Sequence, residues 1–157
     1  MRFRMKKYGP LNFPALLLFV VLANFFWFPG TTWLQSDTQI YVPIFEHLDY
    51  PAHFQKDLAA AHPHVAFTIY DEVTLALARW TDIGYGGVLQ MQQMVFRACG
   101  IAGVYLLAGA AGLPAAGAFF VAAAFGLGAV VNGPSVLTFE YEPVPRGFAL
   151  MLIFGAL

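Results

Sequence analysis

Two long stretches without any charged side chain constrain the fold of this chain more than any other feature. No Asp, Glu, Lys or Arg occurs in residues 8–36 or 98–139. Each stretch exceeds the about 20 apolar residues that a helix needs to cross a bilayer. Only 11% of all residues are charged, against about 25% in a typical soluble domain. The sequence therefore predicts an all-α, polytopic helical membrane protein.

Four apolar segments are predicted to cross the membrane. The last of them is about half of a full span, so we expect the chain to be the N-terminal fragment of one membrane domain in a longer protein. No internal repeat divides the chain further. The predicted spans cover about residues 11–28, 94–113, 115–131 and 148–157 of residues 1–157.

The residues around the first span predict its orientation. Four basic residues lie within the first seven positions, and positively charged flanks stay in the cytoplasm. The span ends in the bulky sequence FFWFPG at residues 25–30, where a signal peptidase would need small residues. We therefore expect an uncleaved, multi-pass protein of the bacterial cytoplasmic (inner) membrane, with its N-terminus in the cytoplasm.

A long acidic loop is predicted on the extracytoplasmic side, at about residues 30–90. It holds seven acidic residues against two basic ones, as expected of a translocated segment. Three short helices are predicted in it: one after Ser36 and Asp37, one at about residues 51–61 and one at about residues 68–80. Amphipathic helices next to spans commonly lie along the bilayer surface.

Asp37 is the first candidate for chemistry because it follows the first span within about ten residues. A carboxylate held at the membrane surface can accept a proton from an attacking hydroxyl or help to hold a divalent metal. Asp is also a preferred residue for capping a helix N-terminus. Both roles are compatible with the sequence.

A second cluster of charge occurs in the short outer segment TFEYEPVPR at residues 138–146. Its two prolines favour an extended backbone, so Glu140 and Glu142 would project to the same side. Arg146 is able to pair with either carboxylate or to bind a phosphate with two hydrogen bonds. The alternative is an ordinary loop with a surface ion pair.

Four further residues are weaker candidates. Arg97 would hold a lipid phosphate or extend outward to the headgroups. His62 and His64 would contact a phosphate or face outward, since their spacing matches no zinc pattern and no cysteine accompanies them. Asp57 is the second choice for a catalytic acid.

Several function classes are excluded by missing patterns. The chain has no basic stripe, so nucleic acid is not an expected partner. It also lacks the glycine-rich phosphate-binding motifs and the G-x-S-x-G nucleophile elbow.

The layout resembles the opening of the GT-C superfamily of integral-membrane glycosyltransferases, and also that of uncharacterised bacterial multi-span proteins. The segments that carry the resemblance are SDTQIYVP at residues 36–43 and DYPAHFQKD at residues 49–57. It implies transfer of a sugar from a polyprenyl-phosphate carrier on the outer face of the membrane. Asp37 would take the position of the catalytic acid, and Glu140 or Glu142 that of the second acid. Asp37 has no adjacent acid here, unlike many members, so a divalent metal cofactor is left open.

A lipid-linked sugar transferase is therefore the leading functional hypothesis, with membrane lipid and the polyprenyl-phosphate sugar as partners. Asp37 would be the general base, and Arg146 or Arg97 would hold the departing phosphate. A multi-span transporter and a non-catalytic membrane subunit are the alternatives. The transferase hypothesis requires Asp37 to meet Glu140 or Glu142 in space.

Overall fold

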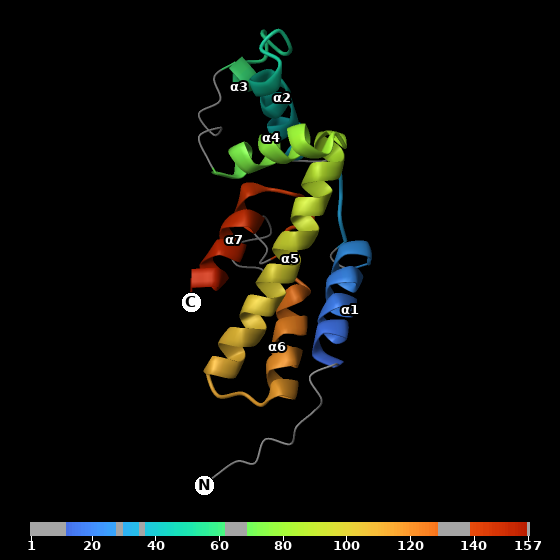
Figure 1. The fold of residues 1–157 in the computed structure, drawn as a ribbon, viewed down its shortest axis with the longest axis vertical. Coiled ribbons are helices and arrows are strands. Elements are labelled where there is room, and N and C mark those ends of the chain that lie inside the picture. The colour runs from blue at the N-terminus through green and yellow to red at the C-terminus, as the bar shows by residue number, and fades with distance from the viewer. Residues whose placement is uncertain (1–11, 28–29, 35–36, 62–68, 129–138, 157) are drawn as a thin grey trace.

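The computed structural model describes residues 12–27, 30–34, 37–61, 69–128 and 139–156, and every regular element in these ranges is an α-helix. The prediction of an all-α fold is confirmed for this part of the chain. One group of helices runs along the molecule, and a second group gathers at one end (Figure 1). The first group, the bundle, is α1 (Asn12–Phe26), α5 (Gly84–Ala110), α6 (Ala115–Gly126) and α7 (Pro145–Ala156), and the end group is α2 (Thr38–Asp49), α3 (Leu58–Ala61) and α4 (Ile69–Thr81).

Helix α5 is the one described helix that is long and apolar enough to cross a membrane. Its 27 residues correspond to a length of about 40 Å, which exceeds the about 30 Å hydrocarbon core. Helices α1, α6 and α7 are also apolar but have 15, 12 and 12 residues. Each of these is shorter than a full span within the described ranges.

Two helices begin earlier than the sequence predicted. Helix α5 starts at Gly84 rather than near residue 94, because the polar Gln92 and Gln93 are buried against other segments instead of ending the apolar region. Helix α7 starts at Pro145 rather than at Phe148. Proline is well tolerated in the first turn of a helix, where its missing N–H has no intrahelical partner.

The predicted helix at residues 51–61 is wrong over most of its length. Residues 51–56 form turns, and Phe54 has a positive φ of 53°, which a helix does not allow. A helix exists only at α3, where Asp57 Oδ1 accepts hydrogen bonds from the N–H groups of Ala59 and Ala60 at 2.9 and 3.1 Å. Asp57 thus begins the helix. The helices predicted on either side of it are confirmed as α2 and α4.

Two hydrophobic clusters lie at different levels of α5. One joins α5 to α1 and α6 and includes the buried Phe139 from the segment before α7. The other joins α5 to α2 and α4 through residues such as Phe45, Tyr70 and Leu89. Because both clusters use α5, this helix fixes the end group of helices relative to the bundle.

Candidate functional site

Arg146 joins the two charged segments that the sequence singled out. Its guanidinium NH2 lies 3.3 Å from Asp37 Oδ2, and its Nε lies 3.2 Å from Glu140 Oε1. Arg146 is in the first turn of α7, whereas Asp37 directly precedes α2. Residues more than 100 positions apart therefore meet where the bundle contacts the end group of helices.

The side chain of Asp37 does not cap α2. It makes no capping hydrogen bond and instead contacts Arg146. The cap comes from Glu142, whose Oε2 accepts hydrogen bonds from the backbone N and the hydroxyl of Thr38 at 3.0 and 3.1 Å. A carboxylate at this position accepts a hydrogen bond from an N–H that has no partner within the helix. Its negative charge also interacts favourably with the positive end of the helix dipole. Asp37 is thereby left for another role.

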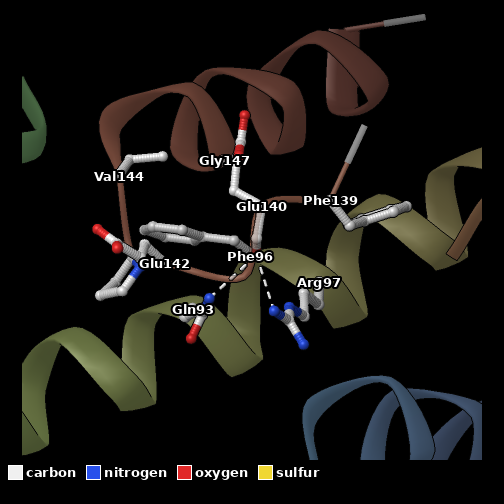
Figure 2. Close-up of a pocket in the computed structure, with 9 residues that line it drawn as sticks. Gln93, Phe96, Arg97, Phe139, Glu140, Glu142, Val144 and Gly147 are labelled. Atoms are coloured by element: carbon white, nitrogen blue, oxygen red, sulfur yellow. Dashed lines mark hydrogen bonds between the residues drawn. The ribbon is translucent and has the colours of Figure 1, made fainter. Parts of the chain in front are cut away.

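Glu140 and Glu142 do not project to the same side. Figure 2 shows their side chains pointing in different directions from the segment that precedes α7. This segment bends at Phe139, Tyr141 and Glu142, so the alternation of an extended strand is lost. Both carboxylates still reach the start of α2, one through Arg146 and the other through Thr38.

Arg97 is a structural residue inside the protein, which corrects the expectation of a lipid or headgroup contact. Its side chain is 2% exposed. NH1 donates to the carbonyl oxygen of Asn24 at 2.7 Å, and NH2 donates to the carbonyls of Gly30 and Glu140. The guanidinium also lies 5.6 Å from the ring centre of Phe25, a cation–π distance. Arg97 thus ties the end of α1 to the segment that carries Glu140.

Three residues that sequence reasoning missed hold the same segment in place. The hydroxyl of Tyr70 donates to the carbonyl of Pro143 at 2.9 Å, and Gln93 Nε2 donates to the carbonyl of Glu140 at 3.0 Å. The backbone N of Thr32 donates to the carbonyl of Tyr141 at 2.9 Å. Burial raises the pKa of the Tyr70 phenol, so it remains a donor at neutral pH. No local sequence pattern marks these residues, because each partner is distant in the chain.

The pocket at this site is too small for a sugar. Its volume is about 10 Å³, room for about one water molecule. Figure 2 shows it between α5 and the segment before α7, with Gln93, Phe96 and Arg97 on its wall. The accessible part of the site is instead the outer side of Arg146 and Asp37, whose side chains are 50% and 39% exposed.

The remaining candidates lie elsewhere or outside the described residues. Asp57 caps α3, which lies at the opposite end of α2 from Asp37 (Figure 1). His62 and His64 fall outside the described residues. Within the described ranges, no three His, Cys, Asp or Glu side chains come together to hold a metal ion.

Comparisons with known proteins do not assign the chain to a family. No family model matches it, and neither a curated protein nor a solved structure gives a significant match.

Proposed function

We propose that this protein is a multi-pass glycosyltransferase of the cytoplasmic membrane that uses a polyprenyl-phosphate-linked sugar on the extracytoplasmic face. The observation that carries the proposal is the position of Arg146 between Asp37 and Glu140. A transfer of this kind needs a base for the acceptor hydroxyl and a cation for the departing phosphate. Here both groups are adjacent, and both are partly exposed.

The pair is suited to exchange with a phosphate. In the ligand-free protein, Arg146 is held by two carboxylates. An arriving phosphate offers it two parallel, charge-assisted hydrogen bonds that compete with Asp37 for the guanidinium. The Asp37 carboxylate then accepts the proton of the acceptor hydroxyl, and that oxygen attacks the anomeric carbon. The bond from this carbon to the phosphate oxygen breaks, and its electron pair leaves with the polyprenyl phosphate beside Arg146.

Glu140 is better suited to positioning than to proton transfer. Its side chain is 8% exposed and forms an ion pair with Nε of Arg146. The NH2 group of the same guanidinium faces Asp37. The backbone carbonyl of Glu140 is fixed by Arg97 and Gln93. Glu140 therefore orients Arg146 toward the exposed side of the site.

The carboxylates do not fit a divalent metal. Asp37 and Glu140 contact the guanidinium of Arg146, and Glu142 is engaged with Thr38. Divalent cations such as Mg²⁺ or Ca²⁺ require oxygen ligands that converge on one point. No step of the proposed reaction is therefore assigned to a metal.

The proposed topology places α2, α3 and α4 outside the cytoplasm and the ends of α5 on opposite faces of the membrane. The four basic residues before α1 support a cytoplasmic N-terminus. Because Cys99 is the single cysteine of the chain, Cys99→Ser gives a background for labelling. Tyr141→Cys and Asp57→Cys should then both react with a membrane-impermeant maleimide added outside intact cells. Labelling of only one of the two would contradict the topology.

Activity is tested with the Asp37→Asn variant, which keeps the size of the side chain and removes its basicity. Membranes that contain this variant should fail to transfer a labelled sugar from polyprenyl phosphate to acceptor. Asp57→Asn is the matched control, because Asp57 lies at the far end of α2, and it should retain transfer. Equal transfer by folded Asp37→Asn and wild-type protein would favour a non-catalytic membrane subunit.

A further inference from the structure

Helix α4 has an unusual distribution of polarity. It buries Asp71 and Thr74, at 1% and 0% exposure, while Ile69 and Trp80 are 68% and 83% exposed. A helix of a soluble protein places its apolar stripe toward the core and its charged side chains toward water. Helix α4 buries Tyr70 and Leu75 as well, but the apolar side chains on its opposite face indicate that its outer surface does not face only water.

The outer surface of α4 divides into two parts. One is an apolar strip, and Ile69, Val73, Ala76 and Trp80 recur along it at spacings of four, three and four residues, which places them on one face of a helix. Beside it runs a charged edge formed by Glu72 and Arg79. We define the α4 apolar strip as Ile69, Val73, Ala76, Leu77 and Trp80.

The contacts of α4 show which way the strip faces. Tyr70 borders the strip and lies between the two groups of helices: its ring centre is 6.5 and 6.1 Å from those of Phe96 in α5 and Phe148 in α7, and 6.0 Å from that of Phe45 in α2. On the charged edge, Arg79 pairs with Asp49 at the end of α2. The charged edge therefore faces the end of α2, and the strip lies on the flank of α4 away from Asp49.

Helix α4 is also held close to the start of the long apolar helix. It ends at Thr81, and α5 begins at Gly84, so the connection between them is too short to let α4 move away. Figure 1 shows α4 lying across the end of α5. If α5 crosses the bilayer, α4 must lie at the height of the outer headgroups.

From these contacts we propose that the α4 apolar strip rests on the outer leaflet of the membrane, with its side chains at the boundary between headgroups and acyl chains. The partner that covers this surface is the lipid bilayer. Tryptophan favours that boundary, and a charged edge facing water beside an apolar face is typical of interfacial helices. Through Tyr70 and Pro143, lipid contact at α4 would hold the Asp37–Arg146 site at the membrane surface.

The proposal rests on the membrane topology of the proposed function but not on its chemistry, and tryptophan fluorescence tests it. The chain has three tryptophans, so Trp27→Phe with Trp33→Phe leaves Trp80 as the only one. The full chain is placed in nanodiscs of phosphatidylcholine that carries bromine either near the headgroup end of the acyl chains or near the bilayer centre. Trp80 should lose most of its emission with the first lipid and little with the second.

Two control proteins separate the possible failures. Trp33→Phe with Trp80→Phe leaves Trp27, at the end of α1, and reports whether α1 enters the bilayer. Replacement of all three tryptophans by phenylalanine together with Glu72→Trp places the probe on the charged edge. That probe should keep its emission in both lipids and remain sensitive to aqueous iodide. Circular dichroism and size-exclusion chromatography establish that each variant is folded.

Each of the other outcomes overturns the proposal. If Trp27 is quenched and Trp80 is not, the strip does not contact lipid although the topology stands. If Trp80 is shielded from both bromine and iodide, a protein surface covers the strip instead. If neither Trp27 nor Trp80 is quenched, the protein is not in the bilayer, and the proposed function fails with it.

Discussion

The carboxylate of Glu142 caps the N-terminus of α2 through both the backbone N–H and the hydroxyl of Thr38, a residue 104 positions earlier in the chain. A helix cap is normally supplied by the residue that precedes the helix. Here that residue is Asp37, whose side chain contacts Arg146 instead. One long-range contact thus completes α2, while the Asp37 side chain pairs with Arg146.

Loss of the Glu142 carboxylate should destabilise the protein. We expect Glu142→Ala to cost about 1–3 kcal/mol, because two donors of Thr38 lose a charged acceptor. Glu142→Gln should cost less, since its amide oxygen still accepts a hydrogen bond. Thermal unfolding in detergent, followed by circular dichroism, measures both. The exposed Glu72→Ala serves as the control, and a loss as large in that variant would argue against the cap.

Replacement of Arg97 should be more damaging than any change at the exposed site. Arg97→Met leaves the buried carbonyls of Asn24, Gly30 and Glu140 without their donor, and each such loss costs about 1–3 kcal/mol. Arg97→Lys should restore little of the lost stability, because an ammonium group lacks the planar arrangement of donors of a guanidinium. The measurement is the yield of monodisperse protein on size-exclusion chromatography. Gln90→Ala, on the exposed side of the same helix, should behave as wild type.

Two glycines of α5 allow close packing that alanine should disrupt. A Cβ at Gly100 would lie 2.7 Å from Cε1 of Phe139, and a Cβ at Gly103 would overlap the Cβ of Phe154. Overpacking of this kind typically costs about 1–3 kcal/mol. Gly100→Ala and Gly103→Ala should therefore lower the melting temperature. Nothing lies within 4 Å of a Cβ at Gly109, so Gly109→Ala is the matched control and should not lower it.

Stability should decrease in acid through the ion pair between Asp49 and Arg79. The hydrogen bond from Arg79 lowers the pKa of Asp49 below its ordinary value, and a smaller contribution comes from Tyr85. A depressed carboxyl pKa contributes stability above the unfolded-state value of about 3.9, and this is lost as the pH falls through the folded-state pKa. The effect should be small, because the Arg79 side chain is 62% exposed and water screens the pair. The decrease in melting temperature from about pH 6 to about pH 3 should be smaller in Asp49→Asn than in wild type, and an identical decrease would exclude the pair as its source.

The sequence by itself determined the helical class and the approximate place of most helices. The charge-free stretches at residues 8–36 and 98–139 favour apolar helices, since their backbone can be satisfied only internally once water is excluded. The period of apolar residues was enough to place α2 and α4. These are local properties, so a single sequence contains them. The predicted span began near residue 94, after Gln92 and Gln93, and only the distant partners of these two residues make their burial favourable.

Only the tertiary structure decided the roles of the charged side chains. The sequence alone left two roles open for Asp37, helix capping and chemistry. The hydrogen bond from Thr38 to Glu142 shows that Glu142 supplies the cap of α2. Arg97, expected near lipid, is instead bonded to three distant carbonyls. A charged group is stabilised by whichever partner the fold brings within hydrogen-bond distance, and that partner's position in the chain is not constrained by local pattern. The meeting of Asp37, Glu140 and Arg146 is therefore a property of the packed helices.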